Sequence, residues 1–268
     1  NFTVLMCTYK KDDPILLEKA IESVFNNSIK PNFFILTIDG AIPKKNQKIV
    51  NKMKEKYTLE INFLKKNLGL ARALNSALPL VKTEWIARAD SDDINFSNRF
   101  EKQIKYAKKG FDVIGSNIFE IDIYETIQLP RLRKIMPINN KEIKSFSRFR
   151  NPMNHMTTFY KKEVVKLVGG YPNIYLREDY GLWAKLICNK RKFININECL
   201  VCVNGGNQLY LRRRGIRNAL GEMQLQIHLF KNNIQPLYLA LFLFFLRASI
   251  LMLPKNIIKY IYINILRH

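Results

Sequence analysis

The sequence contains few acidic residues, few cysteines and little histidine. Its 268 residues include 22 Asp and Glu against 44 Lys and Arg, with four Cys and three His. A chain of this length with so few cysteines is not a disulfide-stapled scaffold. Cys199 and Cys202 form a Cys-x-x-Cys in an apolar run that predicts a strand, where residues three apart face opposite sides. We therefore expect core thiols there rather than a zinc site.

Two further features are missing: a membrane-spanning segment and a glycine-rich loop. The apolar stretch at residues 237–253 has 17 residues and includes Arg247, whereas a spanning helix needs about 20 apolar residues. No secretory signal opens the sequence, so we expect a cytoplasmic protein. The loop "CTYKKDDP" after the first apolar run has no glycine, which counts against a nucleotidyltransferase with a glycine-rich phosphate loop.

The excess of positive charge favours an anionic partner. The formal net charge is +22, which suits nucleic acid, an anionic membrane or a phosphorylated substrate. A nucleic-acid-binding protein is one hypothesis, but it leaves the carboxylates described below unexplained, because they would repel phosphate. Apolar residues make up 47% of the chain, enough for a sizeable core.

Short β-rich runs alternate with helical periodicity. The pattern predicts strands at residues 2–8, 32–40, 59–66, 84–90, 111–122 and 192–204, the last as one strand or a pair. It predicts helices at residues 13–25, 45–57, 67–81, 98–109 and 177–190, and a loop-rich crossover at residues 124–150. The stretch 156–171 predicts a further strand, a short helix and a Gly-Gly turn. Near-continuous apolar strands alternating with helices indicate an α/β fold whose mostly parallel sheet is covered on both faces.

Polar residues end several of the expected strands. Thr8, Asp39 and Asp90 each stand at such a position, and parallel sheets bind ligands at the carboxyl ends of their strands. Asp92 and Asp93 follow Asp90 closely in "ADSDDI". From these residues alone three uses stay open. They are binding of a divalent cation, general acid–base work, and capping of the next helix by Asp93.

Seven stretches give the sequence a family resemblance. In order they are "TVLMCTYKKDD", "LTIDG", "NLGLARALNSAL", "WIARADSDDI", "NPMNHMTTFY", "GGY…REDYGLWAKL" and "RRRG". Together they span roughly residues 2–215 and resemble the family 2 glycosyltransferases of the Rossmann-like GT-A fold, above all the branch that builds bacterial exopolysaccharide and O-antigen. The resemblance implies a mixed, mostly parallel central sheet flanked by helices. It also implies an inverting, metal-dependent transfer of one hexose, of glucose or galactose type, from a UDP-sugar to a hydroxyl of a lipid-linked oligosaccharide.

The same resemblance assigns donor-side residues. It implies that Asp92 ligates Mn²⁺ or Mg²⁺, and that Asp90 shares the metal or lies near the ribose. Asp39 would hydrogen-bond the uracil, although a turn aspartate is the ordinary alternative. Thr8 would touch the base or ribose. Arg72 would lie under the nucleotide and pair with carboxylates such as Asp90, the alternative being a solvated surface charge.

On the acceptor side, the resemblance implies that Asp179 is the general base and that Glu178 binds or positions the acceptor. Two acids at a helix start can also simply complement the helix dipole. Trp183 would stack on a sugar ring, although most such tryptophans belong to the core. His155 would be a pocket residue near donor or acceptor, against the alternative of a structural hydrogen bond.

A basic cluster follows in "QLYLRRRG". Arg212 and Arg214 would belong to a lid that reaches the diphosphate, or to a helix face that meets anionic lipid. Many processive relatives carry Gln-x-x-Arg-Trp here. Because no Trp follows in this sequence, we predict transfer of a single sugar rather than polymerisation.

The composition predicts a catalytic domain at residues 1–215 and a helical tail at 216–268. The nucleotide-sugar-binding half would cover about 1–120 and the acceptor-binding half about 121–215. Residues 205–268 hold nine Lys and Arg but one acid, Glu222. We expect this apolar and basic tail to attach the protein peripherally to anionic lipid on the cytoplasmic face of the inner membrane. Packing of the tail on the domain or on a second subunit is the alternative.

Overall fold

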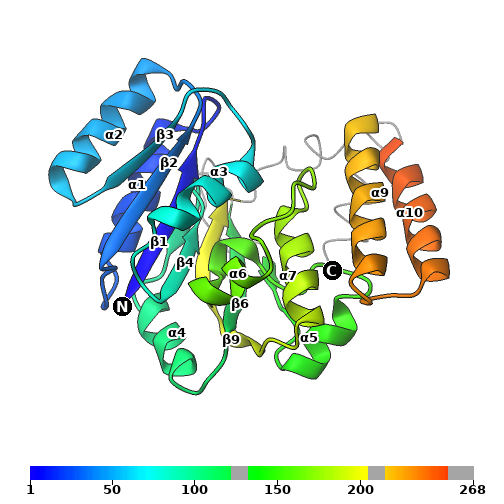
Figure 1. The fold of residues 1–268 in the computed structure, drawn as a ribbon. Helices are drawn as coiled ribbons and strands as arrows, with labels where there is room; N and C mark the ends of the chain where they lie inside the picture. Colours follow the sequence, from blue (N-terminus) through cyan, green and yellow to red (C-terminus); the bar gives the residue numbers. More distant parts are fainter. Residues whose placement is uncertain (122–131, 205–214, 253–268) are drawn as a thin grey trace.

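One nine-stranded sheet organises the protein, with helices on both of its faces (Figure 1). The structure is a computed structural model that describes residues 1–121, 132–204 and 215–252. The strands are β1 (Phe2–Thr8), β2 (Phe33–Asp39), β3 (Glu60–Leu64), β4 (Trp85–Ala89), β5 (Ile94–Asn95), β6 (Val113–Ile121), β7 (Leu132–Lys134), β8 (Phe159–Lys161) and β9 (Phe193–Asn204). The α-helices are α1 (Pro14–Phe25), α2 (Lys44–Lys56), α3 (Leu70–Ala77), α4 (Arg99–Ala107), α5 (Asn140–Phe146), α6 (Lys162–Leu167), α7 (Glu178–Cys188), α9 (Ile216–Lys231) and α10 (Leu237–Met252). Two short 3₁₀ turns, η1 (Leu78–Leu80) and η2 (His155–Thr157), complete the described elements.

The strand order is β3-β2-β1-β4-β8-β6-β9-β5, with β7 paired to β6. β1 runs parallel to β2 and to β4, and β2 runs parallel to β3. β8 is antiparallel to both of its neighbours, β4 and β6. The predicted mixed, mostly parallel sheet is therefore confirmed. Because β1, β2 and β4 end at the same edge, Thr8, Asp39 and Asp90 are brought to one side of the sheet.

Alternate residues of the central strands supply two separate cores. Leu5 of β1 packs on the face covered by α3 and α7, whereas its neighbours Val4 and Met6 pack on the face covered by α1 and α2. Since successive side chains point to opposite faces of a strand, a strand buried on both sides has to be apolar at every position. This explains why "FTVLMCT" contains no charged residue.

The segment expected to be an irregular crossover contains a helix. α5 begins at the N-cap Asn139, whose Oδ1 accepts from Glu142 N at 3.0 Å. This bond satisfies one of the N–H groups that a helix start leaves without partners. The Glu142 carboxylate reaches back and accepts from Ile138 N, one residue before the cap, at 2.9 Å. The residues "NNKE" at positions 139–142 carry the sequence signal for this helix start. The helix has only seven residues, so no periodic apolar pattern revealed it. β9 is one strand, and its pairing with β6 shifts register beside Asn117.

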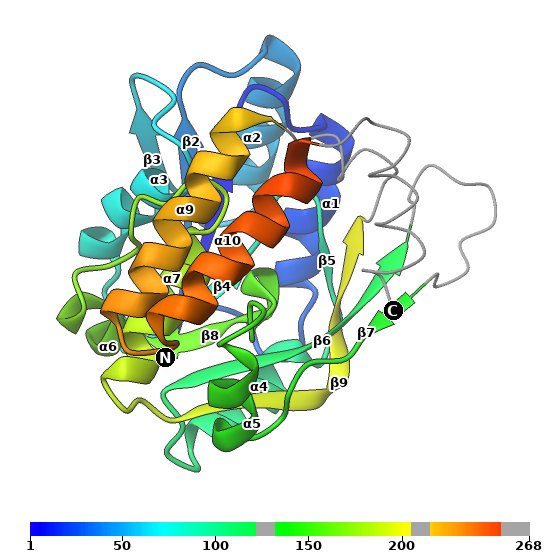
Figure 2. The same cartoon turned by 90° about the vertical axis from the view of Figure 1, so that its right-hand side faces the viewer.

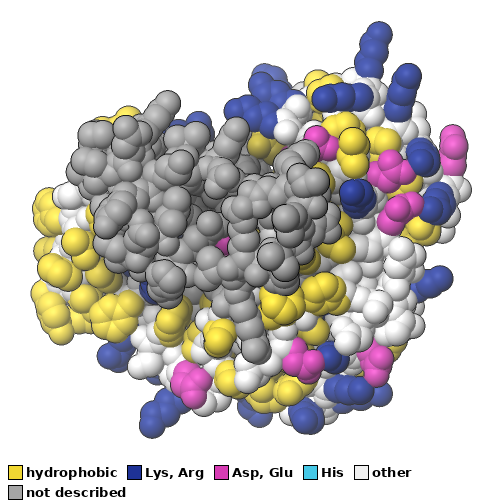
Figure 3. Space-filling model, turned by 180° about the vertical axis from the view of Figure 1, so that it is seen from behind, with side chains coloured by type: hydrophobic (Ala, Val, Ile, Leu, Met, Phe, Trp, Pro, Cys, Tyr) yellow, Lys and Arg dark blue, Asp and Glu magenta, His cyan; other side chains and the backbone are white. Residues whose placement is uncertain are grey.

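The last two described helices form a hairpin against α7 (Figure 2). Gly221 on α9 approaches Tyr175 so closely that a Cβ there would lie 2.8 Å from its carbonyl oxygen. Apolar side chains gather on the outer side of this hairpin, at the left of Figure 3. Neither described helix combines the length and the apolar character needed to cross a bilayer.

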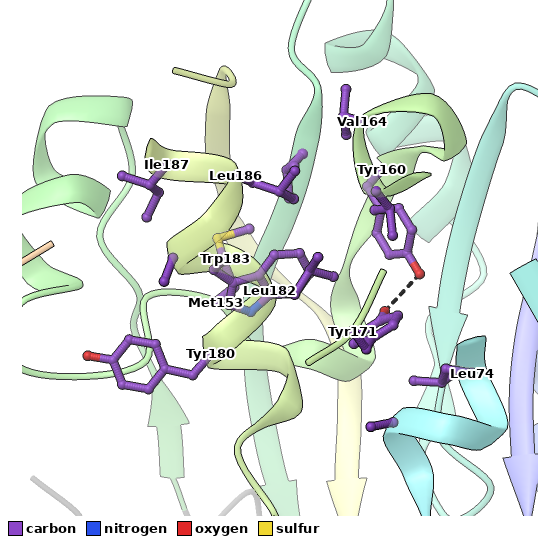
Figure 4. Close-up of a cluster of buried hydrophobic side chains, with 14 of the residues drawn as sticks. Leu74, Met153, Tyr160, Val164, Tyr171, Tyr180, Leu182, Trp183, Leu186 and Ile187 are labelled. Carbon is purple, nitrogen blue, oxygen red and sulfur yellow. Dashed lines mark hydrogen bonds between the residues drawn. The ribbon is translucent and has the colours of Figure 1, made fainter. Parts of the chain in front are cut away.

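Trp183 lies at the centre of the core between the sheet and α7 (Figure 4). Its side chain is 0% exposed, and it meets the rings of Tyr160 and Phe193 edge-on, each at 6.3 Å between centroids. The expectation that Trp183 stacks on a sugar is therefore wrong. Residues four apart share a helix face, and Trp183 stands one turn deeper along α7 than Asp179, where Tyr160 and Phe193 enclose its ring.

We expect Trp183→Ala to lower the free energy of unfolding by about 3–5 kcal/mol, because it leaves a cavity in a close-packed core. Trp183→Phe should cost less, since the indole Nε1 has no hydrogen-bond partner to lose. Urea unfolding measures both. The matched control is Phe63→Ala on β3, where the side chain is 57% exposed and the change should stay within about 0.5 kcal/mol. Equal losses for Phe63→Ala and Trp183→Ala would contradict this account of the core.

Candidate active site

Three carboxylates meet in the loop that follows β4. Oxygen atoms of Asp90, Asp92 and Asp93 lie within 4.8 Å of one another. Asp93 is buried and accepts a hydrogen bond from Asn204 N at the end of β9. It leads into β5 and caps no helix, which removes that alternative from the sequence analysis. Burial, with Asp92 and Asp90 beside it, raises the pKa of Asp93 well above its ordinary value.

The donor set of this cluster suits a hard divalent cation. Carboxylate oxygens are the ligands that Mg²⁺ and Mn²⁺ prefer. Three such groups within 4.8 Å repel one another as anions, and a divalent cation would offset that repulsion. The geometry thus fits the expected Asp90 and Asp92 and adds Asp93 as a third candidate ligand.

Arg88 is the buried cation beside the cluster. Its Nη2 lies 2.5 Å from Asp90 Oδ1, and its Nη1 donates to Leu5 O at 3.1 Å. The expected partner of Asp90 was Arg72, but Arg72 is exposed on α3, and within the described ranges no ion pair joins it to Asp90. That expected pairing is wrong. Residues 88 and 90 are two apart and so project to the same side of an extended chain, a signal in "ARAD" that could have identified Arg88.

Asp12, which the sequence analysis did not single out, fixes the middle of the acidic loop. Its Oδ2 accepts from Ser91 Oγ at 2.7 Å and from Tyr9 N at 3.2 Å. These bonds tie the loop after β1 to the loop after β4. Burial raises the pKa of Asp12, and the bond from Ser91 opposes that rise. Thr8 is buried at the end of β1, directly before this loop.

Asp39 organises the loop before α3. Its carboxylate accepts from Leu68 N at 2.7 Å, from Gly69 N at 2.9 Å and from Asn67 Nδ2 at 3.0 Å. Gly40 must stay a glycine here, because its φ is +84° and a Cβ would lie 2.7 Å from Asn67 N. The turn role weighed for Asp39 is therefore present in the structure.

Glu178 and Asp179 form the first turn of α7. Asp179 Oδ2 accepts from Asn151 Nδ2 at 2.6 Å, and its Oδ1 accepts from Tyr180 N at 2.7 Å. Both oxygens of Asp179 are thus held in place. Glu178 is buried, and this burial, followed by the charge of Asp179, raises the pKa of Glu178 to about 7. The sequence analysis missed Asn151, which opens the "NPMNH" stretch.

The acidic loop and the acid pair of α7 belong to one electrostatic region. The charges of Arg88 and Asp90 both act on the pKa of Glu178.

His155 is buried, and its Nε2 lies 3.1 Å from the hydroxyl oxygen of Tyr171. Burial and then Arg88 lower the pKa of His155 well below its usual value, so its ring is neutral at pH 7. Arg212 and Arg214 lie outside the described residues.

Comparison with known proteins places this site in context. The model of glycosyl transferase family 2 matches residues 3–178. The chain is 33% identical over 268 residues to the UDP-Gal:alpha-D-GlcNAc-diphosphoundecaprenol beta-1,3-galactosyltransferase of Escherichia coli, covering 100% of this chain and 97% of that protein. It is also 33% identical over 226 residues to the amylovoran biosynthesis glycosyltransferase AmsE of Erwinia amylovora, covering 84% of each.

Solved structures share the fold. The mannosyltransferase PcManGT from Pyrobaculum calidifontis, in complex with GDP-Man and Mn²⁺, superposes with a TM-score of 0.66 at 15% identity. The match covers 92% of this chain and 69% of that one. Together with the sheet topology described above, it identifies the architecture as the expected GT-A fold.

The raised pKa of Glu178 makes stability depend on pH. Its pKa is about 7 in the folded protein against an ordinary value of 4.5. The unfolded chain therefore releases this proton first as pH rises, and the folded state loses stability between about pH 4.5 and 7. A difference of this size corresponds to about 3 kcal/mol. We expect Glu178→Gln to remove the loss, so that its stability relative to wild type rises across this window in urea unfolding.

The exposed Glu163 on α6 provides the control. Glu163→Gln should change the unfolding free energy by the same small amount at both ends of the window. If Glu178→Gln also changed the unfolding free energy by one constant amount across the window, the raised pKa of Glu178 in the folded protein would be refuted.

Proposed function

Because the chain belongs to glycosyl transferase family 2, we propose that it moves one hexose from a UDP-sugar to a hydroxyl of a lipid-linked saccharide, with inversion at the anomeric carbon. The observation that carries the proposal is the Asp90–Asp92–Asp93 cluster in the loop after β4, and it is supported by the charge of Asp90 acting on Glu178 of α7. The likeness to the Escherichia coli galactosyltransferase supports a galactose-type donor and a lipid-linked acceptor. The likeness to the amylovoran biosynthesis enzyme AmsE supports a role in polysaccharide biosynthesis.

The acidic loop is the proposed donor side. Asp92, Asp90 and Asp93 would hold a divalent cation, Mn²⁺ or Mg²⁺, which when bound supplies positive charge to offset that of the departing diphosphate. Arg88 orients Asp90 through their ion pair. Asp12 holds Ser91, and with it the turn between the two outer ligands.

The loops after β1 and β2 complete the donor side. Thr8 and Asp39 end neighbouring strands at this edge, so we assign them to the nucleoside, as the resemblance implies. Asp39 would do so while keeping the loop before α3 in place. Arg72 stays a proposed nucleotide contact, because its exposed side chain on α3 is not committed to Asp90. His155 is assigned a structural role behind the site, since its ring is buried against Tyr171.

Asp179 is the proposed general base. An inverting transfer needs one base that removes the proton of the attacking hydroxyl. The carboxylate of Asp179 lies at the start of α7, where the helix dipole favours its charged form. Asn151 and the backbone N–H of Tyr180 hold its two oxygens. Glu178 beside it would orient the acceptor.

The rival hypothesis of a nucleic-acid-binding protein does not fit this site. Nucleic acid binding relies on Lys and Arg that neutralise phosphates. The edge of the sheet where a ligand would lie instead presents three carboxylates.

A panel of UDP-galactose, UDP-glucose, UDP-N-acetylglucosamine and GDP-mannose, with and without Mn²⁺, tests which donor the protein uses. We expect turnover with a UDP-hexose, and turnover with GDP-mannose alone would overturn the assignment.

Two substitutions separate donor binding from proton removal. We expect Asp92→Ala and Asp179→Ala each to lower transfer by more than about 100-fold. Only Asp92→Ala should abolish the rise in melting temperature that UDP gives in the presence of Mn²⁺, because only Asp92 is on the donor side. Glu84→Gln, an exposed change at the other end of β4, should leave both readouts unchanged. Wild-type transfer in either alanine variant would remove that residue from the mechanism.

Asn151 should position Asp179. Asn151→Ala removes the 2.6 Å hydrogen bond to Oδ2, and we expect kcat to fall about 10- to 100-fold with KM for the donor unchanged. The acid limb of the pH–rate profile should move to higher pH, because the charged carboxylate loses a donor. Asn189→Ala, at the exposed far end of α7, is the control. An unchanged pH profile for Asn151→Ala would show that Asn151 has no influence on the base.

A further inference from the structure

The outer face of the α9–α10 hairpin is a large unpartnered apolar surface. Along α9 the exposed apolar residues recur at helical spacing, and along α10 they form a second stripe beside the first. The set, which we name the hairpin face, comprises Ile216, Leu220, Met223, Ile227, Phe230, Leu237, Tyr238, Leu241, Phe242, Phe245 and Leu246. Figure 3 shows this apolar region at its left. Water-soluble monomers rarely expose a contiguous surface of this kind unless it meets a partner.

The charge around the hairpin face has one sign. The single acid between residues 216 and 252 is Glu222. Its carboxylate is buried and bonded to Arg177 and Arg247, each at 2.8 Å. No carboxylate of the described hairpin is therefore exposed, whereas Arg217 and Lys231 are. An apolar surface whose own two helices expose basic and no acidic side chains complements an anionic, apolar partner.

We propose that the hairpin face lies on an anionic lipid surface, with the aromatic and aliphatic side chains of α10 inserted among the headgroups and acyl chains. Over residues 216–252, the part of this region that the structure describes, neither helix is long enough to span a bilayer, and we place both helices in its interface. Basic side chains at the rim add attraction to anionic headgroups that salt weakens. A second copy packed face to face would offer no exposed acid of the described hairpin to pair with Arg217 or Lys231, whereas anionic headgroups would pair with both.

The hairpin is fastened to the helix that carries the acid pair. Arg177, which bonds Glu222, directly precedes Glu178 and Asp179. His228 Nε2 of α9 lies 3.0 Å from the carbonyl oxygen of Gly181 on α7. Docking of the hairpin face would thus set the start of α7 at a fixed distance from the lipid. That this distance would suit a lipid-linked acceptor rests on the proposed function, whereas the binding of the hairpin face to lipid does not.

Vesicle co-sedimentation of the full chain tests the proposal. The probes are phosphatidylcholine vesicles with and without phosphatidylglycerol. We expect the wild-type protein to sediment with the mixed vesicles, and high salt to weaken this binding. The variant Phe242→Ser/Phe245→Ser removes two side chains that are 61% and 64% exposed. Its affinity for the mixed vesicles should fall at least about tenfold, because the variant loses the free energy that each phenylalanine gains when it leaves water for the membrane.

The matched control is Ile15→Ser/Phe63→Ser, which removes two side chains of similar exposure, 61% and 57%, from α1 and β3. It should bind vesicles like the wild type, and both double variants should keep the wild-type melting temperature. Equal vesicle binding by wild type and the hairpin variant would overturn the proposal. A second result would also overturn the proposal: light scattering that finds the wild type as a dimer and the hairpin variant as a monomer, while the variant keeps its lipid binding.

Transfer to a water-soluble acceptor separates this proposal from the proposed function. The hairpin variant should keep wild-type transfer to such an acceptor, because no residue of the active site is changed. Vesicle binding without any transfer by the wild type would contradict the proposed function alone. Transfer without vesicle binding would contradict the lipid surface alone.

Discussion

The ion pair between buried Arg88 and Asp90 is the interaction on which the site depends. Three carboxylates in one loop repel one another, and a buried charge is tolerated only with a partner and hydrogen bonds. Arg88 supplies that partner from within β4 and is itself held by Leu5 O. Arg99 supports the same strand by donating to Arg88 O at 2.7 Å. Burial and the charge of Arg88 lower the pKa of Arg99 to about 9.

Two cations thus lie behind the acidic loop and make its charge tolerable in the folded protein. Removal of one partner of such a pair leaves the other charge buried and unpaired, which destabilises the folded protein. The same charges reach Glu178 on α7. The site that we propose therefore has two sides: the acidic loop after β4, which would hold a cation, and the carboxylate of Asp179 on α7, which would remove the acceptor proton. The hairpin attached to α7 extends this arrangement towards a surface that is apolar and basic.

Much of the fold followed from the sequence, because periodicity reports which side of an element is buried. The strands that end at Thr8, Asp39 and Asp90, and the helix that begins at Glu178, were predicted within a few residues of their observed bounds. Short elements were the exceptions. α5 has seven residues and β5 has two, too few for a periodic pattern to emerge. The acidic cluster was also readable, since its three carboxylates are neighbours in the chain.

What the sequence alone determined is therefore the order of the elements, the acids at the ends of the strands and the basic, apolar character of the tail. Tertiary structure decided which distant residues meet them: Arg88 instead of Arg72 beside Asp90, and Asn151 against Asp179 across 28 positions. It also decided that Trp183 faces the core. The physical reason is that spacing along a chain fixes the direction of a side chain relative to its own helix or strand. The partner it meets depends on how elements far apart in sequence pack together.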